Sequence, residues 1–154
     1  MMLASVLDRL LDDAPQAAQE SPFGARFDLA RHKQAVARDL EALLNTRSTL
    51  LEPALAARHP LASRSLLAYG IPDLSSLSLL NPDHRRRLRD QIHEAVVRFE
   101  PRLCQVRVDL EPPGAGNRLL RFRVEAVLRG HPGRPAVVFA AVLKLSSNAC
   151  QVRG

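Results

Sequence analysis

The carboxylates are the residues of this chain that could most directly carry out acid–base chemistry. Glycoside hydrolysis, for example, needs two carboxylic side chains on either side of one bond. The candidates are Glu94, Glu100, Asp109, Glu111 and Glu125. Sugar clefts usually also offer aromatic platforms, and this chain has no Trp and a single Tyr. We therefore expect these carboxylates to form structural ion pairs, and we do not expect a hydrolase or any other enzyme.

The sequence also shows no pattern typical of a metal site or of a catalytic nucleophile. The histidines are scattered along the chain, at His32, His59, His84, His93 and His131. No GxGxxG, P-loop, HExxH or GxSxG pattern occurs. Cys104 and Cys150 lack CxxC spacing, so we expect reduced, buried thiols, although a disulfide between them remains open. The sequence predicts no metal, no cofactor and no small-molecule substrate.

Length and composition favour one ordinary domain. The chain has 154 residues, of which 46% are hydrophobic and only 4% aromatic, so the core should be aliphatic. No apolar run reaches the roughly 18 residues that a membrane helix needs, and the start of the chain does not read as a signal peptide. We expect a cytoplasmic protein without direct membrane insertion.

The charge is basic, at +6, and leaves a second interpretation open. Acidic partners, including nucleic acid, could bind such a chain. However, 20 of its 22 basic residues are Arg, a skew that a coding bias would also produce. Sheets that bind single strands usually expose aromatic side chains for base stacking, and the predicted outer face here carries Arg and Glu instead. A basic α+β nucleic-acid-binding module is the alternative function, and nucleic acid is not the expected partner.

Helical patterns fill the first two-thirds of the chain. Residues 3–12 predict a short amphipathic helix, and residues 13–27 predict a linker with two prolines. A second helix should run from an N-cap at Asp28 to about residue 44, with its apolar stripe on Leu29, Val36, Leu40, Leu43 and Leu44. A short helix is expected over 61–68. The clearest helix spans 82–99, with Asn81 as its cap.

Strand patterns fill the last third. Residues 105–110, 120–128 and 136–145 alternate between apolar and polar positions or are apolar on both faces. The fold class is therefore α+β: N-terminal helices packed on one face of a small C-terminal antiparallel three-stranded meander. We expect a single domain over 1–154, with a helix and linker at 1–27, a helical part at 28–100 and the sheet at 101–146. The third strand also carries Val138, Ala140 and Val142 on its second face, beside an open sheet edge that invites a partner.

The segment Phe99-Glu100-Pro101-Arg102-Leu103 joins the best helix to the first strand. Pro101 fixes its own φ and restricts Glu100, and residues two apart in an extended segment point the same way. Glu100 and Arg102 should therefore lie side by side on a stiff backbone. This pair is either an internal salt bridge at a helix stop or part of an interface.

Four segments, in the same order, resemble one known family. They are Ser5-Val6-Leu7-Asp8-Arg9-Leu10, Asp39-Leu40-Glu41-Ala42-Leu43-Leu44-Asn45-Thr46-Arg47, Tyr69-Gly70-Ile71-Pro72-Asp73-Leu74 and Phe99-Glu100-Pro101-Arg102-Leu103. The chain is thereby similar to the TssE baseplate subunits of type VI secretion, which are related to a phage baseplate wedge protein and often labelled lysozyme-like. Ala68 departs from the Asn that is common before the Tyr-Gly step.

The resemblance implies a non-enzymatic structural subunit of a contractile baseplate. Its partners would be other wedge proteins and the contractile sheath. Glu100, Pro101 and Arg102 would hold the wedge's central helical bundle. The sheet, with Val138, Ala140 and Val142, would accept sheath strands and so template sheath polymerisation.

Overall fold

The computed structural model describes residues 29–48, 57–62, 65–74, 77–112, 119–129, 133–144, 146–147 and 149–154, with Leu7 and Leu10. Leu7 and Leu10 are helical, and their side chains are exposed. The rest of the predicted helix at 3–12 and the linker at 13–27 lie outside the described residues. The predicted turn between the first two strands also falls largely outside them.

Two long helices form where the 3.6-residue periodicity predicts them. Helix α2 spans Leu29–Asn45, and helix α4 spans Pro82–Phe99. The Asn81 side chain caps α4 by accepting a 2.8 Å hydrogen bond from the backbone N–H of Asp83. One expected position differs: Leu29 is 38% exposed, and His32, one turn later, is buried instead. Leu29 is the first residue of α2, and this end of the helix projects beyond the core.

The short helix expected over 61–68 is smaller than predicted. The structure describes a 3-10 turn, η2, at Leu66–Ala68, and Ala62 is also in 3-10 conformation. The Ser65 hydroxyl donates to the carbonyl oxygen of Ala62 and accepts from the N–H of Leu67. These local side-chain bonds compete with helical backbone pairing, which explains the shorter element.

The sheet has four antiparallel strands, in the order β1-β2-β3-β4. Their bounds are Leu103–Leu110 for β1, Leu119–Leu128 for β2, Ala136–Lys144 for β3 and Ala149–Arg153 for β4. The α+β class is confirmed, but the prediction of three strands is wrong because β4 follows β3 and pairs with it. Five residues with one buried and one half-buried side chain are too few to show a strand period.

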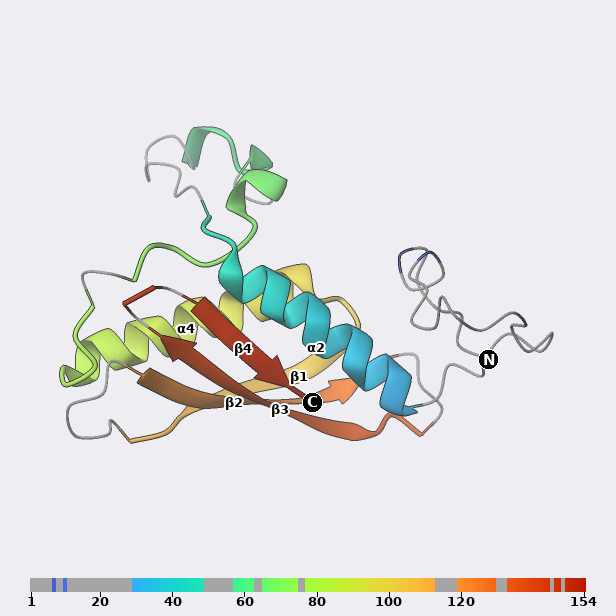
Figure 1. Cartoon of the computed structure of the whole chain (residues 1–154). Helices are drawn as coiled ribbons and strands as arrows, with labels where there is room; N and C mark the ends of the chain where they lie inside the picture. Colours follow the sequence, from blue (N-terminus) through green and yellow to red (C-terminus); the bar gives the residue numbers. More distant parts are fainter. Residues whose placement is uncertain are drawn as a thin grey trace.

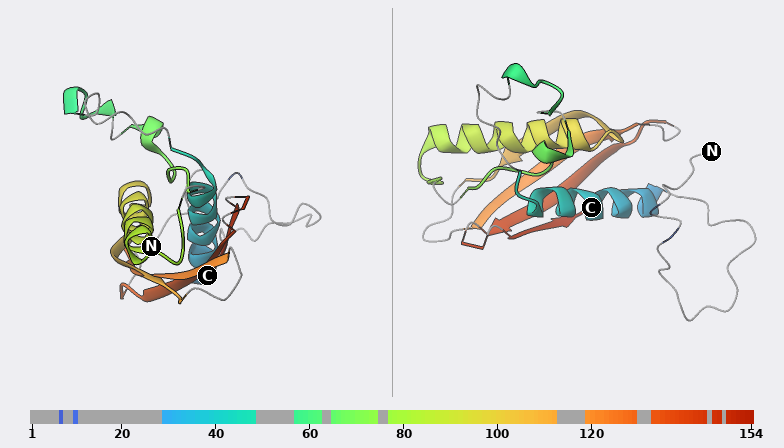
Figure 2. Two further views of the ribbon diagram at one scale, coloured as in Figure 1. Left: turned by 90° about the vertical axis from the view of Figure 1, so that its left-hand side faces the viewer. Right: turned by 90° about the horizontal axis from the view of Figure 1, so that it is seen from above.

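Both helices cover the same face of the sheet, and no described element covers the other face (Figures 1 and 2). Helix α4 packs over β1, and α2 packs over β4. The alternation predicted for the strands is confirmed, and every second side chain of β2 and β3 points into the core. Phe122 and Phe139 are the largest fully buried side chains, surrounded mainly by Leu, Val and Ala. Neither helix is long and apolar enough to cross a bilayer, as far as the described residues extend.

Candidate functional site

The corner between α4 and β1 holds a buried carboxylate and its arginine. Helix α4 ends at Phe99, and Glu100 caps it with a backbone N–H bond to the carbonyl oxygen of Val96. The Glu100 residue is only 3% exposed. Arg102 donates to its Oε1 from Nε at 2.7 Å and from the backbone N–H at 3.2 Å, and its Nη2 binds Oε2. Glu100 and Arg102 thus lie side by side, and the carboxylate points inward rather than into solvent.

Two further segments meet at this corner. The same Nη2 of Arg102 donates to Oδ2 of Asp39, on α2, at 2.6 Å. The Tyr69 ring packs edge-on against the ring of Phe99, with 5.2 Å between ring centroids and 69° between ring planes. We call Asp39, Tyr69, Glu100 and Arg102 the corner network. It joins three parts of the chain that are far apart in the sequence.

The charges of the corner network support one another. Burial lowers the pKa of the Arg102 guanidinium, but hydrogen bonds and attraction from Glu100, and then from Asp39, outweigh burial and raise the pKa overall. Burial also raises the pKa of Tyr69, with smaller contributions from the negative charges of Asp39 and Glu100. Both carboxylate oxygens of Glu100 are bound to Arg102. This arrangement holds the backbone of the corner in one conformation.

The backbone of the corner is fixed on both sides. The N–H of Leu103 donates to the carbonyl oxygen of Glu100 at 3.1 Å. The N–H of Arg129 donates to the carbonyl oxygen of Arg102 at 2.7 Å. Between them the Pro101 ring is exposed, whereas the side chains of Arg102 and Asp39 keep 24% and 31% of their surface in solvent. The corner therefore offers a neighbour a rigid proline flanked by a partly exposed ion pair.

Gly70 holds Tyr69 in position. Its φ of +108° lies in the region that favours glycine, and a Cβ there would come within 2.2 Å of the carbonyl oxygen of Thr46. That close approach lets the N–H of Ile71 bind the Thr46 carbonyl, while the N–H of Ser48 binds the Ile71 carbonyl, both at 3.0 Å. The chain after α2 and the chain before α4 are thereby joined beside the corner network.

Val138, Ala140 and Val142 lie on the exposed face of β3, away from the helices. The edge expected beside the third strand is only partly open. β4 pairs with β3 from Ala140 to Lys144, which includes Ala140 and Val142, whereas Val138 lies before this pairing. The three residues and the corner network are therefore different surfaces, on opposite sides of the sheet.

The outer border of β4 is also closed. Asn45 accepts a 2.7 Å bond from the N–H of Cys150 and donates a 2.9 Å bond to its carbonyl oxygen. The N–H of Val152 donates to Oε2 of Glu41 at 2.8 Å. Side chains of α2 thus satisfy the outward backbone groups that a partner strand would need here.

The border of β1 is different. The N–H of Glu111 binds the carbonyl oxygen of Arg121, so antiparallel alternation turns the N–H and C=O of Val108 and Leu110 away from β2. Arg85 reaches the carbonyl oxygens of Leu110 and Glu111 at the end of the strand. At the other end a bulge between Cys104 and Arg107, with Gln105 at φ +53°, breaks the register.

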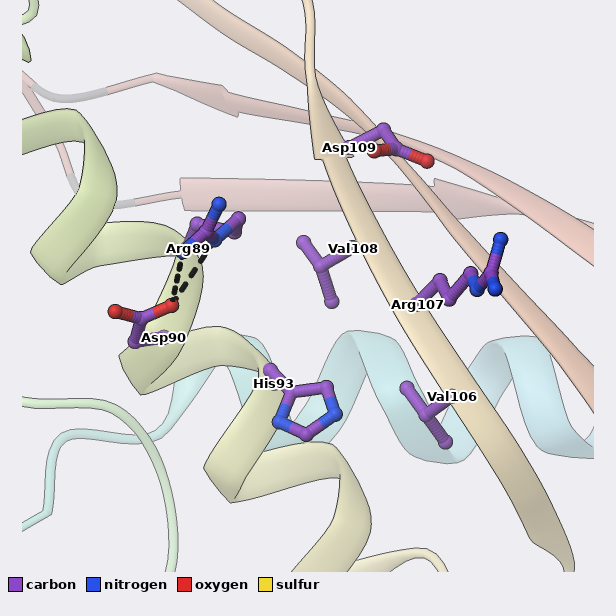
Figure 3. A pocket seen from close by; sticks show the side chains of 7 residues that line it. All are labelled: Arg89, Asp90, His93, Val106, Arg107, Val108 and Asp109. Atoms are coloured by element: carbon purple, nitrogen blue, oxygen red, sulfur yellow. Dashed lines mark hydrogen bonds and ion pairs between the residues drawn. The ribbon is translucent and has the colours of Figure 1, made fainter.

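A groove of about 320 Å³ runs along this border, between α4 and β1. Arg89, Asp90 and His93 line it from the helix, and Val106 to Asp109 line it from the strand (Figure 3). The valine side chains point toward the helix, whereas Arg107 and Asp109 point away from it. In the described part of the chain, β1 and the start of β3, from Ala136 to Phe139, each have a border that pairs with no other strand.

The other candidates for chemistry are dispersed. Glu94 pairs with Arg98 on α4, and Glu125 faces Arg107 across the sheet. Cys104 and Cys150 are free thiols on β1 and β4, the two outer strands, so the disulfide is ruled out in this fold. Cys104 is half-buried and Cys150 is buried. No group of three metal-ligating side chains occurs among the residues that the structure describes.

Sequence reasoning located Glu100, Pro101 and Arg102 but missed Asp39 as their partner, and it missed Asn45 and Glu41 as edge caps. Asp39 had one usable signal: an acid directly before the buried Leu40 lies at the border of the apolar stripe. The edge caps had none, because β4 itself was not predicted.

The described residues form a two-layer α+β domain, with two helices on one face of a four-stranded antiparallel sheet. Residues 30–133, about two-thirds of the chain, match the family described as baseplate wedge protein gp25. The chain belongs to this family, whose members are structural components of a baseplate. Comparison with curated proteins gave no match, and comparison with solved structures gave none. The corner network lies inside the matched stretch, whereas β3 and β4 lie beyond it.

Proposed function

We propose that this chain is a non-enzymatic wedge subunit in the baseplate of a cytoplasmic, contractile type VI secretion machine. The family supports the baseplate role, and the resemblance to TssE subunits favours type VI secretion over a phage tail. One observation carries the proposal: the matched stretch contains the corner network, whose charged side chains bind one another and hold the backbone around the exposed Pro101 in one conformation. A wedge subunit needs such fixed geometry, because its work is to orient neighbours.

In this proposal Pro101 and Arg102 contact the other wedge subunits, and the buried Glu100 contributes through Arg102, whose guanidinium it holds in place. Binding to a preformed corner loses little conformational entropy, which favours affinity. The partly exposed Arg102 and Asp39 would become desolvated at the interface, where charged pairs are worth more than at a free surface. The exposed Pro101 ring would provide the central apolar contact.

Co-purification with the wedge subunits tests this role. Pro101→Glu adds a charge at the exposed position and leaves Glu100 and Arg102 in place, so the fold should persist while wedge recovery falls at least tenfold. Arg102→Lys keeps the charge but loses the two-pronged bond to Glu100, and it should weaken recovery less. Pro112→Glu, a charge at another exposed proline, is the control. Full recovery with Pro101→Glu, at an unchanged melting temperature, would contradict the role of the corner.

The sheet would template the sheath by strand addition, and we assign this role to the border of β1. The β4 border is capped by α2, and β3 is an inner strand along most of its length. The border of β1 has outward backbone groups at Val108 and Leu110 and a groove beside them. An extended sheath segment would add main-chain hydrogen bonds there and place alternate side chains toward α4.

Val108→Pro is the sharpest test of this border. Proline removes the outward N–H of an edge strand but no bond to β2, a position where sheets tolerate it. Val108→Ala, which also shortens the buried side chain but keeps the N–H, is the matched control. We expect Val108→Pro to abolish fluorescent sheath foci while wedge co-purification continues, and Val108→Ala to retain foci. Normal foci with both variants would reject β1 as the template.

A further inference from the structure

The outer face of the sheet carries a column of small apolar side chains. Ala136, Val138, Ala140 and Val142 follow one another along β3, on the face that no described helix covers (Figure 2). Val138 is 44% exposed and Val142 is 37% exposed. Side chains two residues apart on a strand share a face, so these four form one continuous strip.

Long basic side chains flank the Ala140 and Val142 part of this strip, whereas the acidic Glu125 of β2 lies beside Val138. The strand register places Arg123 of β2 and Arg153 of β4 on either side of Ala140. Arg121 lies beside Val142 in the same way. Including the strand ends, the exposed basic residues of this face are Arg107, Arg121, Arg123, Lys144 and Arg153, against the acidic Asp109 and Glu125.

The basic residues are also not paired off across the strands. Arg107 faces Glu125, and Asp109 faces Arg123. No salt bridge links either pair among the residues that the structure describes. The charges of this face therefore remain available to an incoming partner.

We propose that this outer face binds an acidic amphipathic helix of a partner protein. The apolar ridge of the helix would lie along the β3 strip, and its flanking carboxylates would reach the arginines of β2 and β4. The strip from Ala136 to Val142 is about 20 Å long, which corresponds to about 13 residues of α-helix. Such a helix would give the sheet a layer on each face, the usual way of covering an apolar sheet surface.

Other occupants fit less well. A second copy of the chain would bring arginine against arginine, and an added strand would find no unpaired backbone between Ala140 and Lys144. The phosphates of a nucleic acid could bind the arginines, but they would leave the aliphatic strip without an apolar partner. The phenylalanines of these strands, Phe122 and Phe139, are buried on the opposite face and cannot stack on bases.

The proposal is independent of the baseplate role and of the β1 border. It can be tested on the full chain labelled with ¹⁵N, with a designed helical peptide of about 14 residues as the probe. The peptide has a leucine ridge flanked by glutamates, and a second peptide with lysines in place of the glutamates is its control. Single-stranded oligothymidine forms a third arm. We expect saturable shifts from the acidic peptide only, centred on Val138, Ala140 and Val142 and their neighbours.

A charge-reversal pair makes the test specific. Arg123→Glu with Arg153→Glu should raise the dissociation constant of the acidic peptide at least tenfold. Arg58→Glu with Arg87→Glu changes the net charge equally at exposed positions elsewhere and should change it less than twofold. The proposal is overturned if no saturable shift occurs, if the lysine peptide binds equally, if shifts map elsewhere, or if only the oligonucleotide binds this face.

Discussion

Asn45 and Cys150, which are 105 residues apart, exchange two hydrogen bonds: the Asn45 amide accepts from the Cys150 N–H and donates to the Cys150 carbonyl. The Asn45 side chain, at the end of α2, thus makes the two hydrogen bonds that a neighbouring strand would make to Cys150 of β4. It both attaches β4 to the domain and closes the border of the sheet.

Removing this amide should weaken the fold. Asn45→Ala leaves both backbone groups of Cys150 without their partner, and we expect a loss of about 2 kcal/mol in the free energy of unfolding. Glu41→Gln, which keeps an acceptor for the N–H of Val152, should cost less. Urea denaturation measures both. Equal unfolding midpoints for wild type and Asn45→Ala would show that β4 does not depend on this contact.

Gly70 should be intolerant of any side chain. Gly70→Ala combines a φ of +108° with a contact of 2.2 Å to the backbone of Thr46, so we expect a loss of about 3 kcal/mol or more. Gly133→Ala is the matched control, since Gly133 has a φ of +80° but no atom within 4 Å of an added Cβ. It should cost about 1 kcal/mol. Thermal unfolding of the two variants would disprove the steric argument if both lost the same stability.

Tyr69 offers a direct reading of the corner network. It is the sole tyrosine of the chain, so phenolate absorbance near 295 nm reports on this residue alone. Burial, and then Asp39 and Glu100, raise its pKa, so the native midpoint should lie above 10.0 and return to about 10 in urea. Asp39→Asn should lower the native midpoint only in part, because burial is the larger cause.

The sign of the linked stability follows from the same shift. Below pH 10 the phenol is protonated in both states, and its ionisation has no effect on folding. Above pH 10 the unfolded state releases the proton first, so the stability contributed by Tyr69 declines as pH rises toward the native midpoint. Asp90→Asn, an exposed change outside the network, is the control for the titration. An identical midpoint in native and denatured protein would contradict the burial of Tyr69.

The two cysteines should differ in reactivity. Burial, and secondarily Glu41, raises the pKa of Cys150 to about 12, and its thiol is also shielded from solvent. At pH 8 Ellman's reagent should label the half-buried Cys104 first and reach Cys150 only as the protein unfolds. Two thiols should react in denaturant. Fast labelling of Cys150 in the native protein, tested with Cys104→Ser, would contradict the packing of β4.

Periodicity predicted the elements whose stabilisation is local or repeated many times. Helix α4 has a polar cap, a proline in its first turn and an apolar stripe through Leu88, Ile92 and Val96, and it forms as expected. The ten residues of β2 alternate over their whole length. Strand β4 was missed because it depends on contacts that no local window contains. The helix expected over 61–68 was overestimated because local Ser65 side-chain bonds compete with helical backbone pairing.

The candidate site divides in the same way. Proline chemistry and strand spacing predicted that Glu100 and Arg102 would lie together, since both effects act within three residues. The bond from Arg102 to Asp39 of α2 joins residues 63 positions apart in the chain, and no local pattern could predict it. The open border expected beside the third strand is covered from Ala140 to Lys144 by β4, a strand that was not predicted, and side chains of α2 in turn bind the outward backbone groups of β4.

The pairing of Thr46 and Ser48 with Ile71 has a consequence for how this protein can change. It ties together Thr46 and Ser48, just after α2, and Ile71, so the two ends of the intervening stretch are held side by side. Doubling the length of such a tethered excursion costs only about 0.6 kcal/mol of chain entropy. Leu61 and Leu66, which are 82% and 83% exposed, lie within it. The segment between Ser48 and Ile71 could therefore change in sequence and length, in evolution or by engineering, while the two long helices and the sheet stay the same.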